Sequence, residues 1–434
     1  MAEVFDLNIP LQVEVAAFVK NEYSLCNNCS KGLENPSSFD PRGVLNPPNP
    51  MLNQGGEAGN TNENLFLWML TANVFHEFDN AIKVEARATA RGRDSGADII
   101  DNYWIDLYGG VSYPKYGLLQ VGKMTSRSWT RSDSFSYPLG LSLWSESGAG
   151  YGLFPEAVRY GTPQFEIPLG KLYFEATYAT ADTRPPLNAN LVAESCPTCA
   201  SAPTPKLYEV FVQYSNEKNL VELIYQDSEG ALQSYFAKGP FIGSQGDTNG
   251  PNGSPGYRKP YEKVVILNGN YWLNPTWKFT YGLRWSEWSG QQQQCDFGPV
   301  SPVKEACFWD QAGFNYSKNG RLHRAEEWDA LLGVAYTRQL WVYTLGGVRF
   351  NKAYTNTPTE WGQSNTATFL NLGVYRKVPE VYGKMEVYGG LGHVFYGRQG
   401  PAPLSMPSNT AFGGVDPRTS ESGQFLTLGV NFLY

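Results

Sequence analysis

The sequence predicts an all-β protein: a sixteen-stranded antiparallel transmembrane β-barrel that forms one domain over residues 1–434. Apolar residues recur at every second position in segment after segment, and no long run with helical period competes. Short turns and long polar stretches alternate between these segments. No stretch approaches the ~18 consecutive apolar residues of a membrane helix, so any membrane crossing must use strands.

The composition fits strands with one apolar and one wet face. Aromatic residues make up 14% of the chain and charged residues 17%, below the ~25% of typical soluble domains, yet the mean hydropathy is −0.38. The net charge of −7 opposes nucleic-acid binding, which prefers a basic surface. No signal peptide precedes Ala2, and we expect Met1 to be an added start on a mature chain whose leader was cleaved.

The predicted strands follow one another in chain order. The third is the clearest, because apolar and charged residues alternate strictly in IKVEARAT at 82–89. The last, GQFLTLGVNFLY at 423–434, should pair with the first so that no edge remains open. The predicted strands are 4–20, 64–78, 81–91, 100–113, 118–127, 154–163, 171–181, 206–216, 219–227, 261–273, 277–289, 323–338, 340–353, 365–377, 384–398 and 423–434.

The connections support a barrel rather than a soluble β-sandwich or jelly roll. Long polar connections are unusual in compact soluble domains, whereas short turns at one end and long loops at the other are typical of outer-membrane barrels. Apolar outward positions in nearly every strand, and aromatic residues near strand ends, point the same way. The short turns are 79–80, 114–117, 216–218, 274–276 and 379–383; the long connections are 21–63, 128–153, 182–205, 228–260, 290–322 and 399–422.

Three stretches resemble the general porins of Gram-negative bacteria: ANVFHEFDNAIKVEARATARG at 72–92, YGLLQVGKMTS at 116–126 and AVRYGTPQF at 157–165. They stand in the family's order, and sixteen is the family's strand count. The resemblance implies a homotrimer of water-filled pores in the outer membrane, among its lipid and lipopolysaccharide. It implies that a third long loop, here about 127–153, folds into the barrel. It also implies that the assembly machinery reads the last strand through Val430, Phe432 and Tyr434.

A pore needs charged side chains on the lumen face, where water solvates them. The resemblance matches Lys123 and Arg159 to basic positions that line the porin constriction. Strand parity alone adds Lys83, Glu85, Arg87 and Arg284 to the lumen; the third loop adds the bases Arg127 and Arg131 and the acids Asp133 and Glu146. The porin resemblance implies passive diffusion of small hydrophilic solutes, and the surplus of bases predicts a mild anion preference.

The sequence is also compatible with other functions. Tyr137, Trp144 and Tyr151 of the third loop would suit a sugar-selective channel, although loop aromatics more often serve packing. The charged lumen residues could equally be solvated positions without a special role. A non-channel barrel, enzyme or adhesin, is a further class. The chain has only 3 histidines and no GxSxG motif, so we expect no enzyme, no cofactor and no metal.

The 6 cysteines all fall in the predicted long connections. If these connections face an oxidising exterior, disulfides are expected, and pairing within each loop is the simplest of the possible connectivities. The expected pairs are Cys26–Cys29, Cys196–Cys199 and Cys295–Cys307. Two CxxC pairs also have the spacing of a Cys₄ zinc site, and free thiols remain possible. A redox CPTC would need a βαβ context that this sequence lacks.

Overall fold

A computed structural model describes most of the predicted strands and the short turns between them. Within the described residues nearly every position is extended, and every pair of neighbouring strands is antiparallel. No helix in this part of the chain is long and apolar enough to cross a membrane. The described residues are 11–27, 61–93, 104–128, 130–131, 152–180, 206–229, 261–289, 325–351, 354–355, 366–379, 384–396 and 422–433.

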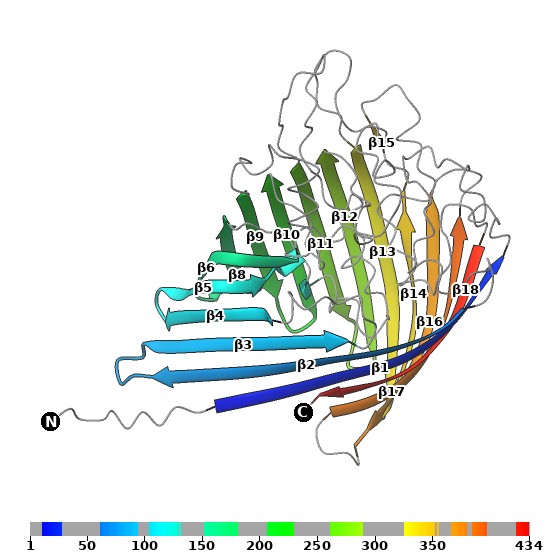
Figure 1. The fold of residues 1–434 in the computed structure, drawn as a ribbon, viewed down its shortest axis with the longest axis horizontal. Coiled ribbons are helices and arrows are strands. Elements are labelled where there is room, and N and C mark those ends of the chain that lie inside the picture. Colours follow the sequence, from blue (N-terminus) through cyan, green and yellow to red (C-terminus); the bar gives the residue numbers. More distant parts are fainter. Residues whose placement is uncertain are drawn as a thin grey trace, which may run out of the picture.

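The strands form one sheet that closes on itself. They are β1 (Leu11–Asn27), β2 (Thr61–Glu77), β3 (Lys83–Arg93), β4 (Trp104–Tyr113), β5 (Gly117–Thr125), β6 (Leu153–Gly161), β7 (Phe165–Ile167), β8 (Gly170–Ala179), β9 (Lys206–Ser215), β10 (Asn219–Glu229), β11 (Tyr261–Trp272), β12 (Trp277–Ser289), β13 (Ala325–Arg338), β14 (Trp341–Phe350), β15 (Tyr354–Thr355), β16 (Ala367–Val378), β17 (Lys384–Tyr396) and β18 (Ser422–Leu433). β1 pairs with β2 on one side and with β18 on the other, which closes the barrel (Figure 1).

Two of the wall strands are interrupted. β6 and β7 both pair with β8, and β14 and β15 both pair with β13, so that each couple forms one strand of the wall. The wall therefore has sixteen strands, and the predicted fold class is confirmed.

The first strand extends further along the chain than predicted. The alternating pattern fades after Lys20, which is why the sequence places this strand at 4–20. The backbone nevertheless continues to pair with β18 as far as Asn27, opposite Ser422. Ladder hydrogen bonds are made by the backbone, so a segment with mixed side chains can extend a strand. Cys26 consequently lies in β1 rather than in a connection, while residues 4–10 lie outside the described residues.

The two faces of the barrel wall have opposite polarity. Leu332, Leu372 and Leu428 point outward and are 69%, 54% and 55% exposed, and apolar side chains continue around the outer face. The inward positions carry most of the buried polar and charged residues, such as Glu222 and Asn268. This is the reverse of a soluble barrel and is the arrangement expected when lipid surrounds the wall and water fills the interior.

A bulge in β5 redirects the chain before the third long connection. The register with β6 shifts between Gly122 and Met124, and Gly122 has a φ of 137°, which favours glycine. A Cβ at this position would collide with the carbonyl oxygen of Leu107. The bulge explains why strand parity could not place Lys123 from the sequence. Val121 points outward, but the consecutive residues Met124 and Thr125 are both buried, so the alternation of faces is broken between them and Val121.

We expect Gly122→Ala to lower the free energy of unfolding by about 1–3 kcal/mol, because the side chain forces strain on the bulge. Urea unfolding of the refolded barrel measures the loss. Gly109→Ala on neighbouring β4 is the matched control, since its added Cβ would make only an ordinary 3.8 Å contact with the carbonyl oxygen of Glu85. Equal stability losses in the two variants would show that the conformation of Gly122 is not the cause.

Candidate functional site

The lumen face of β6, β8, β9 and β10 carries aligned rows of polar residues. Directly paired residues of antiparallel strands share a face, so the register alone brings these side chains together. The first row is Arg159, Thr177, Glu209 and Gln226; the next contains Glu175, Phe211 and Ile224; the one beyond it contains Tyr173, Gln213 and Glu222.

A helical turn that follows β5 rests on these rows. It includes Arg127, Ser128 and Arg131, and the amide of Thr130 donates a 3.1 Å hydrogen bond to the carbonyl of Ser126. This turn begins the third long connection, and it lies on the lumen side of the wall because its partners are lumen-facing side chains. Residues 132–151 of the connection lie outside the described residues.

Glu209 holds the start of the turn. Its carboxylate accepts the backbone amides of Arg127 at 2.7 Å and Ser128 at 3.0 Å, which are otherwise unsatisfied donors at a helix start. Gln226 donates to the same carboxylate at 3.1 Å and to the Ser128 hydroxyl at 2.9 Å. A negative charge is also favourable at this end of a helical turn. One buried carboxylate of β9 thus fixes where the chain turns inward.

The arginine side chains of the turn pair with two further wall carboxylates. Arg127 makes a bidentate contact with Glu175, with Nη2 2.6 Å from Oε1, and Arg131 Nε lies 3.4 Å from Glu222 Oε1. Burial alone would lower the pKa of Arg127, but the hydrogen bond and charge of Glu175 outweigh burial and raise it. The Phe211 ring lies 5.7 Å and 5.5 Å from the two guanidinium carbons, within cation–π range.

Arg159 lies beneath the turn and is only 4% exposed. It donates to the Thr177 hydroxyl at 2.9 Å and to the Thr125 carbonyl at 2.8 Å, and its Nη2 lies 3.8 Å from Glu209 Oε1. Arg159 therefore connects the end of β5 to the polar rows. Because it is so deeply buried, the Arg159 guanidinium is screened from water and is held by side chains and backbone of the wall.

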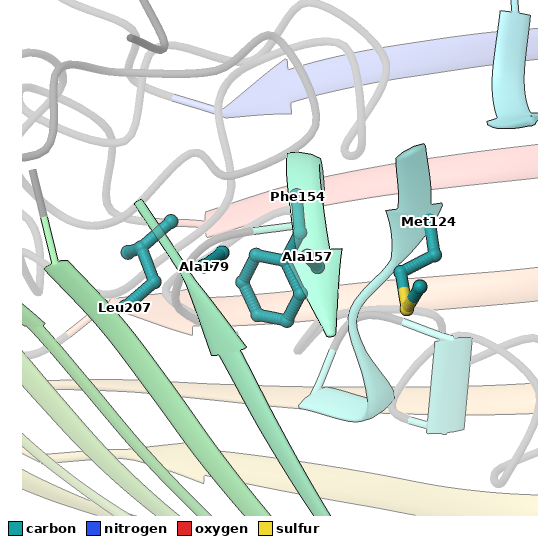
Figure 2. Packing of buried hydrophobic residues seen from close by; sticks show 5 residues of the cluster. All are labelled: Met124, Phe154, Ala157, Ala179 and Leu207. Carbon is teal, nitrogen blue, oxygen red and sulfur yellow. The ribbon is translucent and has the colours of Figure 1, made fainter. Parts of the chain in front are cut away.

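An apolar cluster closes one side of this polar network. Figure 2 shows Met124, Phe154, Ala157, Ala179 and Leu207 gathered from β5, β6, β8 and β9. Ala157, Ala179 and Leu207 form the lumen row next to that of Arg159, on the side of the long connections. This packing excludes water, so the nearby charge pairs act in a medium of lower dielectric constant than water. We name the turn at 126–131, with Glu175, Glu209, Glu222 and Arg159, the loop anchor.

The other predicted charged residues that the structure describes lie elsewhere on the wall, and all but Lys123 lie on the lumen face. On β3, Arg87 lies 3.4 Å from Asp106, Glu85 accepts from Gln120 at 3.0 Å, and Lys83 Nζ lies 4.5 Å from the Phe75 ring centre. Lys123, beside the bulge of β5, is half-buried and stands opposite the outward-facing Leu107, so the register does not assign it to the lumen face. Arg284 on β12 is fully buried and pairs with Asp329 on β13. The lumen placements from parity agree with the structure; the pore roles of these residues remain predictions.

Several predicted residues cannot be placed. Asp133, Glu146, Tyr137, Trp144, Tyr151, Tyr434 and the cysteines other than Cys26 lie outside the described residues. In the strand that carries the expected assembly signal, Val430 and Phe432 are half-buried. No group of three or more His, Cys, Asp or Glu side chains that could hold a metal ion occurs in the described ranges.

The wall carboxylates were not among the residues predicted from the sequence. Glu175, Glu209 and Glu222 each alternate with outward apolar neighbours, so the parity rule that placed Arg87 and Arg284 would also have found them. Pairing could not be foreseen, because it depends on the register between strands. On the described lumen face, arginines lie within 4.0 Å of carboxylates in these pairs: Arg87 with Asp106, Arg127 with Glu175, Arg131 with Glu222, Arg159 with Glu209 and Arg284 with Asp329.

No family model and no curated protein sequence matches this chain. Solved structures match it over nearly its whole length. An anion-selective porin from Comamonas acidovorans is similar with a TM-score of 0.57 and 10% identity, covering 98% of this chain and 100% of that chain. The trimer form of OmpT, an outer membrane protein of Vibrio cholerae, gives 0.54 and 13% identity with coverages of 98% and 99%. The outer membrane channel DcaP of Acinetobacter baumannii gives 0.50 and 9% identity with coverages of 98% and 97%. The chain therefore has the barrel fold of bacterial porins.

Proposed function

We propose that this protein is an outer-membrane porin: a water-filled channel through which ions and small hydrophilic solutes diffuse passively. The observation that carries the proposal is the polarity of the closed wall, which is apolar outward and charged inward. The fold shared with the Comamonas acidovorans porin and with the channel DcaP supports the same function. The Vibrio cholerae trimer form supports a homotrimer.

The third long connection, about 127–153, is proposed to narrow the channel. Its described first turn rests on lumen side chains, with Glu209 at its start and Glu175 and Glu222 beside it. A segment fixed in this way begins inside the barrel, and Asp133 and Glu146 belong to its continuation. The exported chain would lose a leader before insertion, and its last strand would present Phe432 and Tyr434 to the assembly machinery.

The charge pairs affect the proposed selectivity. Each arginine of the loop anchor faces a carboxylate, so these arginines add little net positive potential to the channel. We propose a mild anion preference carried mainly by Lys83, which is half-buried on the lumen face of β3. A preference of this size is consistent with a general diffusion channel.

Liposome swelling tests the proposed function. Vesicles that contain the refolded protein should swell in isotonic solutions of small sugars and amino acids, at rates that fall steadily with solute size. Protein-free vesicles and vesicles with heat-denatured protein are the controls. Swelling with a single sugar, and with no others of equal size, would favour a substrate-selective channel. Absence of swelling with every solute would contradict a diffusion channel.

Lys83→Glu should shift the channel toward cations. The change replaces +1 by −1. At ~8 Å in water this is worth about 1 kcal/mol for a passing ion, against chloride and in favour of potassium, so before salt screening the chloride-to-potassium permeability ratio should fall by about 2 kcal/mol, or roughly thirtyfold. The reversal potential in a KCl gradient measures this ratio. Lys115→Glu, in the exposed turn between β4 and β5, makes the same charge change away from the lumen face and should leave the ratio unchanged. Equal shifts in both variants would refute the assignment of Lys83.

A further inference from the structure

A row of basic and aromatic side chains crosses the outer face where β13 turns into β14. Arg338 and Trp341 flank the two-residue turn Gln339–Leu340 and are direct cross-strand partners. Trp341 is in turn the direct partner of Arg376 on β16. Directly paired residues share a face, and Trp341 is exposed on the outside, so the three side chains form one outward row that we name the rim row.

The rim row carries positive charge that the wall does not neutralise. Among the described residues, no carboxylate lies within 4.0 Å of the guanidinium of Arg338 or of Arg376. At another short turn, by contrast, Lys171 Nζ lies 2.9 Å from Glu166 Oε1. The Arg376 guanidinium lies 5.9 Å from the Trp341 ring centre. A cation over an indole face is held in place while its N–H donors stay available to an anion.

The rows next to the rim row become progressively less polar. The adjacent row is aromatic: ring centres of Trp277 and Tyr336 lie 4.7 Å apart, and those of Tyr336 and Tyr343 lie 6.3 Å apart. The following row is apolar throughout, formed by Phe279, Val334, Leu345, Leu372, Leu391 and Leu426. Each row is two residues, about 7 Å, further from the turn.

We propose that the rim row binds the phosphate of an anionic phospholipid in the leaflet at the short-turn end. The inference rests on the proposed outer-membrane location. The order of rows matches a lipid from headgroup to chain: guanidinium groups for the phosphate, aromatic rings at the interface, and leucines for the acyl chains. Two arginines offer forked donors to phosphate oxygens, and their excess charge favours an anionic headgroup over a zwitterionic one.

Native mass spectrometry of the refolded protein in non-ionic detergent tests the site. The protein is offered equal amounts of phosphatidylglycerol and phosphatidylcholine, and the lipids retained on it are counted. Wild type should retain phosphatidylglycerol in preference. Arg338→Gln and Arg376→Gln should each lower this preference about fivefold, and the double variant should abolish it. Arg349→Gln is the matched control, because Arg349 is exposed on the outer face of the same β14 but bonds to Thr368, at 2.7 Å, near the far end of the strand.

Three results would overturn the inference: equal retention of both lipids by wild type, an unchanged preference in the double variant, or displacement of the lipid by millimolar inorganic phosphate. The last would identify a site for free anions. Heat-modifiable mobility in gels verifies that each variant is folded. Loss of lipid preference from the arginine variants with unaltered channel conductance separates the lipid site from the pore. If the wild-type barrel did not conduct but still retained phosphatidylglycerol in preference, only the proposed channel function would be contradicted, and the lipid site would stand.

Discussion

Glu209→Ala is expected to lower the free energy of unfolding by about 3–5 kcal/mol, because it leaves a buried charge uncompensated. The carboxylate accepts two backbone amides, of Arg127 and Ser128, and lies 3.8 Å from the guanidinium of Arg159. Without it, Arg159 keeps its hydrogen bonds to neutral partners but loses its nearest negative charge. Equilibrium unfolding in urea measures the loss.

The same variant should change the channel as well as the stability. Release of the turn at 126–131 would let the proposed constriction move, so single-channel records should become noisier and the mean conductance should rise. Glu85→Ala on β3 is the matched control: its carboxylate is half-buried, accepts one 3.0 Å hydrogen bond from Gln120 and lies away from the loop anchor. It should cost about 1 kcal/mol and leave the noise unchanged. Equal noise in both variants would contradict the anchoring role of Glu209.

Arg284→Met is expected to cost about 3–5 kcal/mol in free energy of unfolding. Arg284 and Asp329 are paired side chains that are 0% and 1% exposed, so removal of one leaves the other charged and out of reach of water. Asp329 would lose the guanidinium of Arg284 and keep the 3.0 Å hydrogen bond from the backbone amide of Asn351, which is a neutral donor. The free energy of unfolding of the variant in urea tests this expectation.

A double-mutant cycle measures the interaction free energy between Arg284 and Asp329 separately from their contacts with the rest of the wall. In Arg284→Met with Asp329→Leu, neither charge remains, so the double variant should be more stable than either single variant. Met is close to Arg in volume and Leu is larger than Asp, so both positions remain filled. Strict additivity of the two single losses would show that Arg284 and Asp329 do not depend on each other, and it would contradict the assigned charge pair.

Side-chain alternation predicted the wall well, because a barrel with lipid outside and water inside imposes a period of two on every strand. The same rule placed Arg87 and Arg284 on the lumen face. It failed where the backbone departs from regular alternation. The bulge at Gly122 reset the parity around Lys123, and the mixed side chains after Lys20 concealed the second half of β1.

The loop anchor was foreseen only in part. Arg127, Arg131 and Arg159 could be named from the sequence, but their partners on β8, β9 and β10 depend on which residues stand opposite each other across strands. That register is set by hydrogen bonding between segments far apart in the chain. A sequence therefore reveals the charges of a lumen more readily than their pairing, and the pairing decides how much net potential they supply.

The most direct test of the account is the single-channel conductance of the refolded protein in a planar lipid bilayer. We expect stable, ohmic openings at low voltage and, at high voltage, closure in three equal steps per inserted unit. The absence of any conductance from protein that is folded and inserted would contradict the proposed channel.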